Sequence, residues 1–166
     1  MPSRPRTSKS SATAGGIGGA LREDSHLGEH VKPGIQALKA RDRAHIESSL
    51  RQDFHDSLPL DEATAASSPN TNRWDYILGV SGNKQLIGLE VHPATPGEVS
   101  EVIKKKEQAA QVMQQNLRPR LFIHKWFWSS SGTAGINPNT TEYRRLVSAG
   151  IVFVGKTLRK AHLDST

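Results

Sequence analysis

The chain has 166 residues, of which 35% are hydrophobic and 23% are charged, and this suits one compact domain with a modest core. The absence of cysteine excludes disulfide frameworks, thiolate-bound zinc or iron–sulfur sites and cysteine nucleophiles. Neither an apolar run of membrane-spanning length nor the apolar core of a secretory signal occurs, so we expect a cytoplasmic protein with no membrane partner.

The net charge of +6 is concentrated at the two ends of the sequence. Residues 1–20 carry three basic side chains and no acid, and residues 155–166 carry three basic side chains and one acid. The other 134 residues hold 16 basic and 15 acidic side chains. A nucleic-acid-binding function therefore requires the basic residues of the body to cluster on one side.

Residues 1–30 are rich in serine, glycine, threonine and alanine and show no apolar periodicity. Because such a segment cannot offset the entropy of being ordered, we predict a disordered basic tail. We predict a single domain over residues 31–158 and a short C-terminal tail over residues 159–166.

The first predicted element of the domain is an amphipathic helix that begins near Pro33 and ends before Pro59. Its apolar residues at helical spacing are Ile35, Leu38, Ile46, Leu50 and Phe54. A polar connector follows over residues 59–72. Two short apolar runs, residues 74–80 and 85–91, then flank a turn at residues 81–84, and this pattern predicts a β-hairpin.

A second helix is predicted from Thr95, because a capping threonine is followed by proline and, three residues on, by Glu98. Residues 120–128 form an apolar, aromatic strand, residues 140–149 a short helix closed by Gly150, and residues 151–154 a buried strand. The order of elements predicts an α/β fold: a mixed β-sheet of about four strands flanked by helices.

Candidate chemistry gathers at one end of the predicted hairpin. The twofold alternation of a strand places Glu90 and His92 on one face, and Asp75 starts the neighbouring strand near the same level. A carboxylate on an apolar strand is costly to bury unless it is paired or bound to a metal. These three residues could therefore form a Mg²⁺ or Mn²⁺ site that polarises a phosphoryl oxygen and activates water.

This order, with Asp75 opening one strand, Glu90-Val91-His92 ending the next and a helix following at once, resembles the PD-(D/E)XK nuclease superfamily over roughly residues 35–128. The resemblance implies a restriction-endonuclease-like fold and metal-dependent hydrolysis of nucleic-acid phosphodiester bonds. It implies Asp75 and Glu90 as catalytic metal ligands, and Glu47 on the first helix as an auxiliary metal ligand.

The sequence departs from the family pattern at two points. His92 stands where the motif has a lysine, and a neutral imidazole supplies no permanent positive charge. Lys106, on the apolar stripe of the second helix, is the candidate to replace it, and Lys125 on the next strand is another. The family core also has three strands before the helix, whereas the pattern predicts two.

The aromatic strand offers a different function. Alternation places Trp126, Trp128 and His124 on one face, and either tryptophan could stack on a base or contact a protein partner. His124 would join the metal site only if it shared the face of Glu90.

Each of these residues also has an ordinary structural explanation. Asp75 could cap a turn, Glu90 and His92 could bond to each other, Glu47 could be an exposed helix residue, and the lysines could extend past the core into solvent.

Two functions thus remain open: a Mg²⁺- or Mn²⁺-dependent nuclease, and a noncatalytic α/β module that binds a protein partner through the Trp-rich strand. The first explains the acid on an apolar strand. The second explains the missing lysine and the nearly neutral body.

Overall fold

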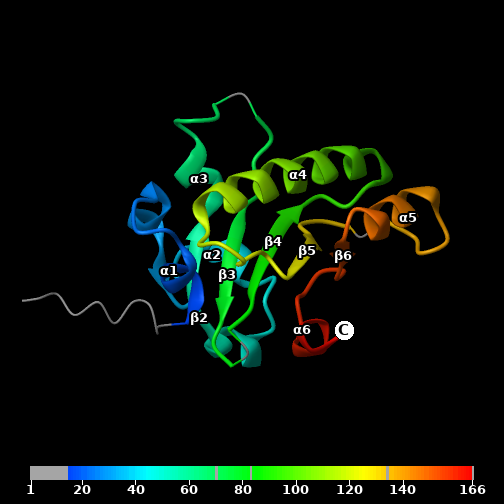
Figure 1. The fold of residues 1–166 in the computed structure, drawn as a ribbon. Coiled ribbons are helices and arrows are strands. Elements are labelled where there is room, and N and C mark those ends of the chain that lie inside the picture. The colour runs from blue at the N-terminus through cyan, green and yellow to red at the C-terminus, as the bar shows by residue number, and fades with distance from the viewer. Residues whose placement is uncertain (1–14, 70, 83, 134, 166) are drawn as a thin grey trace, which may run out of the picture.

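The computed structural model describes residues 15–69, 71–82, 84–133 and 135–165 (Figure 1). Its centre is a six-stranded sheet in which the strands lie side by side in chain order. The strands are β1 (Lys32–Pro33), β2 (Phe54–Pro59), β3 (Tyr76–Val80), β4 (Leu86–His92), β5 (Lys125–Ser130) and β6 (Ile151–Phe153). Strands β1 to β4 pair antiparallel, whereas β5 pairs parallel with both β4 and β6.

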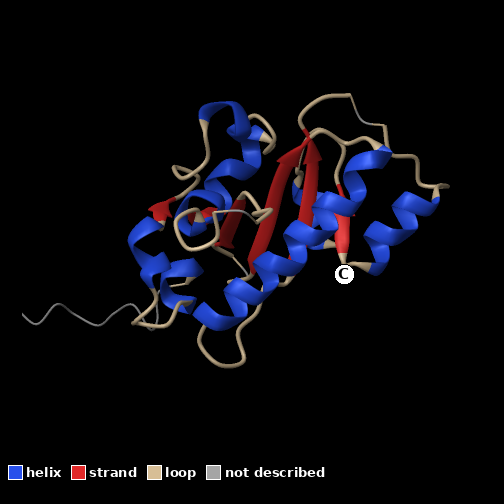
Figure 2. Ribbon diagram, turned by 90° about the horizontal axis from the view of Figure 1, so that it is seen from above, coloured by secondary structure: helices blue, strands red, loops and turns tan. Residues whose placement is uncertain are grey.

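Nine helical segments surround the sheet in the described part of the chain. They are α1 (Gly16–Ala20), η2 (His26–His30), α2 (Ala40–Arg43), η3 (Ser48–Asp53), α3 (Leu60–Thr64), η4 (Pro96–Glu98), α4 (Val99–Asn116), α5 (Thr141–Ser148) and α6 (Lys160–Asp164). The longest, α4, connects β4 to β5 and crosses one face of the sheet (Figures 1 and 2). The predicted α/β fold with a mixed, helix-flanked sheet is confirmed, but the sheet has six strands rather than about four.

Two apolar layers enclose the sheet. On the α4 face, Trp126 and Trp128 of β5 pack with Val102 and Met113 of the helix. The opposite face has its own core, in which Leu89, Phe127 and other strand residues meet the segments around η3 and α6. Its buried members from those segments are Leu38, Ile46, Leu50, Leu158 and Leu163.

The second half of the chain follows the sequence prediction except at the aromatic strand. That strand was expected over residues 120–128, whereas β5 runs from Lys125 to Ser130. The hairpin of β3 and β4 forms, the helix after it ends at the residue before Leu117, and α5 and β6 lie where expected. Thr140 caps α5 through its side chain, which accepts a hydrogen bond from the Tyr143 amide. Gly150 ends that helix at a φ of +76°, which glycine adopts at no steric cost.

The predicted helix over residues 35–54 is wrong. The segment contains only the four-residue α2 and the 3₁₀ segment η3, and its end is strand β2. The apolar residues identified there are nevertheless buried or partly buried, since short turns deliver the same side chains to the core. Helical spacing alone does not distinguish these two arrangements.

The ends of the chain also differ from the prediction. Residues 15–30 contain α1 and η2, with Ile17 and Leu27 fully buried, and the predicted C-terminal tail contains α6 with Leu163 buried. Polar contacts hold α1 against the sheet. The buried carboxylate of Asp56 accepts hydrogen bonds from the backbone amides of Ile17 at 2.8 Å and Gly18 at 2.9 Å. Residues 1–14 of the predicted tail lie outside the described residues.

No helix in the described part of the chain has the length and apolar character needed to cross a membrane.

Replacement of Gly79 tests how closely α1 approaches the sheet. A Cβ atom at Gly79 would overlap the Asp56 carboxylate and lie 2.7 Å from the Gly16 Cα. We expect Gly79→Ala to lower the free energy of unfolding by about 1–3 kcal/mol, measured by urea denaturation.

Gly97→Ala is the matched control, because no atom lies within 4 Å of the added methyl group there. Its effect should stay within about 0.5 kcal/mol. Equal stability of the two variants would contradict the close approach.

Candidate functional site

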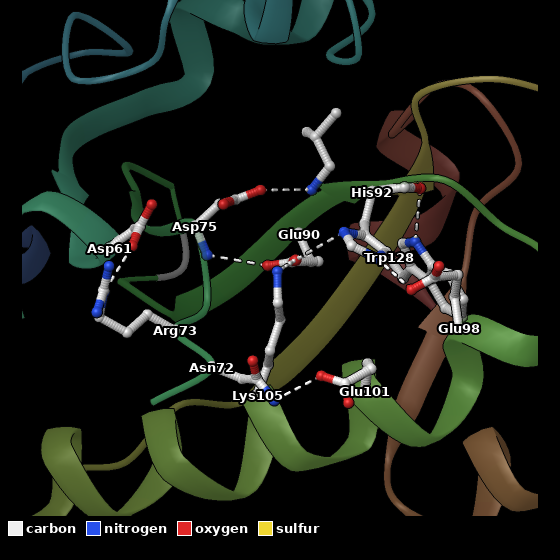
Figure 3. A network of polar contacts seen from close by, with 11 residues as sticks. Asp61, Asn72, Arg73, Asp75, Glu90, His92, Glu98, Glu101, Lys105 and Trp128 are labelled. Atoms are coloured by element: carbon white, nitrogen blue, oxygen red, sulfur yellow. Dashed lines mark hydrogen bonds and ion pairs between the residues drawn. The ribbon is translucent and has the colours of Figure 1, made fainter. Parts of the chain in front are cut away.

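The segment before β3 is fixed by contacts to two helices, and these contacts position Asp75. Arg73 pairs with Asp61 of α3 at 2.7 Å, and the side-chain amide of Asn72 donates to the Glu101 carboxylate of α4 at 2.5 Å. Asp75, the residue just before β3, is thus held in place by the contacts of Asn72 and Arg73, as Figure 3 shows.

Two hydrogen bonds link Asp75 to Glu90 and Val91 of the neighbouring strand β4. The Asp75 amide donates to Glu90 Oε2 at 2.9 Å, and the Val91 amide donates to Asp75 Oδ2 at 3.0 Å. Glu90 is fully buried on the α4 face of β4. The predicted juxtaposition of the two carboxyl groups is therefore present.

The cation beside Glu90 is Lys105, one residue before the predicted Lys106. Its Nζ lies 2.5 Å from Glu90 Oε1, and its side chain is only 15% exposed. Lys106 instead lies over the ring of Trp126, 5.8 Å from the ring centroid. The helical stripe identified the correct turn of α4, but the neighbouring residue Lys105 is the one that reaches Glu90 (Figure 3).

Burial dominates the ionisation of this cluster. It raises the pKa of Glu90 to about 8, reinforced by the charge of Asp75 and opposed by Lys105. Burial likewise raises the pKa of Asp75, although the Val91 amide favours the carboxylate. For Lys105 burial acts to lower the pKa, but the attraction of Glu90 outweighs it, so its pKa is raised and the ammonium stays charged.

His92 belongs to the same cluster. Its Nε2 lies 2.7 Å from Glu98 Oε2 and its Nδ1 lies 3.9 Å from Glu90 Oε1, while its carbonyl accepts the Trp128 indole N–H at 3.0 Å. The sequence predicted a capping role for Glu98 at the start of the helix. Its carboxylate binds the histidine instead, and Thr95 makes no side-chain cap.

Asp75 lies on the wall of a polar cavity of about 520 Å³ at this end of the sheet. Acidic and basic groups converge there from α2 and its flanking residues, from α3 and from the start of β3. The charged or titratable side chains that line it are Lys39, Arg41, Asp42, His45, Asp61, Glu62, Asp75 and Tyr76. Tyr76 donates to the buried Asp42 at 2.5 Å, and burial raises the tyrosine pKa.

His45 is a cavity residue that the sequence did not reveal. Its Nδ1 lies 2.9 Å from the Lys156 carbonyl and 2.8 Å from Ser129 Oγ. A carbonyl only accepts, so Nδ1 carries the proton and Nε2 has the free lone pair. No described residue is a partner of Nε2, and it is absent from the buried unpartnered atoms, so it is open to solvent. The 84 residues between His45 and Ser129 explain why no local signal found it.

Two predicted residues lie away from the cluster. Glu47 is not on a helix; its amide donates to the Leu158 carbonyl at 2.9 Å, and it does not line the cavity. Lys125 donates to the Leu163 carbonyl at 2.7 Å and to neighbouring carbonyls of α6. The structure therefore does not bring either residue together with Asp75 and Glu90.

The aromatic strand is core and not surface. Trp128 is fully buried and Trp126 is only 6% exposed, so neither ring presents an open face on which a base or a partner could stack. His124 accepts the Leu86 amide through Nδ1 at the opposite end of β4 from Glu90. The prediction failed because α4 and α5 cover a strand face that the sequence pattern left open.

A divalent ion such as Mg²⁺ needs several oxygen ligands around one point. Among the described residues, no group of three acidic or histidine side chains is arranged to hold an ion alone. Mg²⁺ and Mn²⁺ commonly take one or two carboxylates and complete their shell with water and substrate oxygens. Asp75 supplies one carboxylate donor at the wall of the polar cavity. Glu90 is adjacent to it but fully buried, so it could serve as the second donor only after releasing Lys105 or the Asp75 amide.

Comparisons with protein-family models, curated proteins and solved structures give no match.

The buried Glu90 predicts an unusual pH dependence of stability. The folded protein keeps this proton up to pH of about 8, whereas the unfolded chain loses it near 4.5. The free energy of unfolding should therefore fall as pH rises between these values, by up to about 1.4 kcal/mol per pH unit.

Urea denaturation at a series of pH values from about 5 to about 8.5 measures this slope. Glu90→Gln, which keeps the shape but not the proton, should flatten it. Glu98→Gln is the control and should retain it. Identical slopes in wild type and Glu90→Gln would contradict the assignment.

Proposed function

We propose that this protein is a metal-dependent nuclease or phosphodiesterase of PD-(D/E)XK type. The observation that carries the proposal is the convergence of Asp75, Glu90 and Lys105 at the end of the sheet where Asp75 lines the polar cavity. Two carboxylates at the ends of neighbouring strands and a lysine from α4 are the residue types that such a hydrolysis needs.

The order of elements supports the proposal. Strands β2, β3 and β4 form an antiparallel meander, α4 follows at once, and β5 returns parallel to β4. The superfamily pattern has three strands before the helix, and β2 is the strand that the sequence prediction lacked.

Lys105 bears on the first departure from the family pattern, the missing lysine at His92. His92, in the motif position, binds Glu98 and supplies no permanent charge. Lys105 brings an ammonium group to Glu90 from the helix, so the positive charge reaches the cluster from another element.

In the proposed reaction, Asp75 and, once released from its present partners, Glu90 would hold Mg²⁺ or Mn²⁺. Such an ion would supply polarisation of a phosphoryl oxygen and a more acidic water. Lys105 keeps Glu90 oriented and places a positive charge beside the attacking group. Across the cavity, Lys39 and Arg41 can pair with phosphate oxygens, and His45 Nε2 can exchange a proton with the substrate.

A noncatalytic interaction module remains the second candidate. Both oxygens of the fully buried Glu90 already have partners, namely Lys105 Nζ and the Asp75 amide. A cluster satisfied in this way is also what a structural ion pair requires.

Asp75→Asn separates the two candidates. It removes the carboxylate that faces the cavity but retains an acceptor for the Val91 amide. We expect Mn²⁺-dependent cleavage of single- or double-stranded DNA or RNA by the wild type, and a loss of about 100-fold or more in the variant, followed by gel electrophoresis with EDTA as the blank. Absence of cleavage of all four substrates by the wild type would favour the module.

The two neighbouring lysines provide a matched pair for the role of Lys105. Lys105→Met should reduce the cleavage rate at least about tenfold because it removes the cation beside Glu90. Lys106→Met, which removes only the contact with Trp126, should keep the wild-type rate when both variants show the same melting temperature. Equal rates for the two variants would exclude Lys105 from the chemistry.

A further inference from the structure

A groove of about 500 Å³ lies at the C-terminal end of α4, away from the polar cavity. We call it the arginine groove. Its floor is apolar, with Met113 and Leu117 from the end of the helix and Ile123 and Trp126 from the start of β5 and the segment before it. Along the helix its lining residues, from Ala110 to Leu117, lie roughly 8 to 18 Å from Lys105, at about 1.5 Å per residue.

Three arginines line the groove: Arg22, Arg118 and Arg120. Among the described residues that line it there is no acid, and none of the three arginines has an ion-pair partner there. The polar cavity is the opposite case, since four acids line it. The lining of this groove is therefore basic, and the nearest acids in the chain are Glu23 and Asp24, which follow Arg22.

Two of the arginines are held in place. Arg22 Nε donates to the Leu117 carbonyl at 2.9 Å, and Arg118 Nε donates to the Leu21 carbonyl at 3.2 Å. These bonds tie the segment after α1 to the end of α4, and the two elements lie side by side in Figure 1. Because each guanidinium is anchored through Nε, its terminal nitrogens can donate together to a planar or tetrahedral oxyanion.

The third arginine occupies a turn. The Leu121 amide donates to the Arg118 carbonyl at 3.2 Å, with Pro119 and Arg120 between them. Arg120 has a φ of +72°, the left-handed conformation that this turn position normally gives to glycine. Arg120 thus occupies a turn position where glycine would be less strained.

Next to these charges, two large apolar side chains face solvent. Phe122 is 60% exposed and Leu121 is 44% exposed. The Phe122 ring rests on the ring of His124, with centroids 4.6 Å apart, and His124 is itself fixed by the Leu86 amide. An aromatic ring held on one side and open on the other suits the stacking of a planar group.

We propose that the arginine groove binds single-stranded nucleic acid, with a base stacked on Phe122 and phosphates held by the three arginines. A duplex presents only its backbone, whereas an unpaired strand offers both the phosphates and an open base face. The inference concerns a surface separate from Asp75 and Glu90, so it does not depend on catalysis.

Fluorescence anisotropy of a labelled oligothymidylate with the full chain, in EDTA and over a salt series, tests the proposal. Phe122→Ala should weaken binding about 5- to 100-fold. Arg120→Gly removes one charge and relieves the positive φ, so it should preserve folding while it lowers the slope of log affinity against log salt by about 0.7.

Val147→Ala and Arg144→Ala on α5 are the matched controls, since both side chains are exposed and distant in the chain from the groove. Both should bind as the wild type does, and so should Asp75→Asn. This last result would separate the groove from the candidate catalytic site, because Asp75→Asn affects cleavage alone.

Three results would overturn the proposal. One is an absence of binding at low salt. Another is unchanged binding by both Phe122→Ala and Arg120→Gly, which would place the oligonucleotide elsewhere. The third is equal competition by a poly-glutamate peptide or by a duplex of the same length, which would make the groove an acidic-peptide site or a nonspecific polyanion surface.

Discussion

The rest of this structure depends on the buried carboxyl group of Glu90, on one of the inner strands of the sheet. Glu90 has no contact with solvent, so its oxygens need partners inside the protein. One partner is the Asp75 amide on the adjacent strand and the other is the Lys105 ammonium on the helix that covers them. The register of β3 against β4 and the position of α4 are therefore linked through one side chain. The contacts of Arg73 and Asn72 extend this link to α3 and to the first turns of α4.

The charges of the body divide into two regions along α4. Near its N-terminal half, acids and bases face each other across the polar cavity, and buried carboxyl groups hold their protons more tightly than usual. At its C-terminal end, arginines gather without acids. A nearly neutral total thus conceals a cavity of mixed charge and a basic groove, a difference that net charge alone could not reveal. Both of the surfaces proposed to meet phosphate lie within reach of the same helix.

The sequence predicted the elements whose signals are local. The hairpin, α4, α5 and β6 each have their own turn or capping residues, and strand alternation correctly placed Glu90 and His92 together. It failed where contacts are distant in the chain. Strand β2 and α1 depend on each other through Asp56, and His45 reaches its cavity only through Ser129 and Lys156. Between Lys105 and Lys106, periodicity could not decide, because the choice depends on where the Glu90 carboxyl lies across the sheet.

The two outermost strands of the sheet are very short. β1 has two residues, one of them Pro33 without an amide hydrogen, and β6 has three. The long strands all have neighbours on both sides. An approaching extended chain would therefore find few free backbone donors and acceptors at either edge, so association by sheet extension is disfavoured. Recognition of other molecules is left to side chains at the strand ends and beside α4, which can select a partner chemically in a way that an open backbone edge cannot.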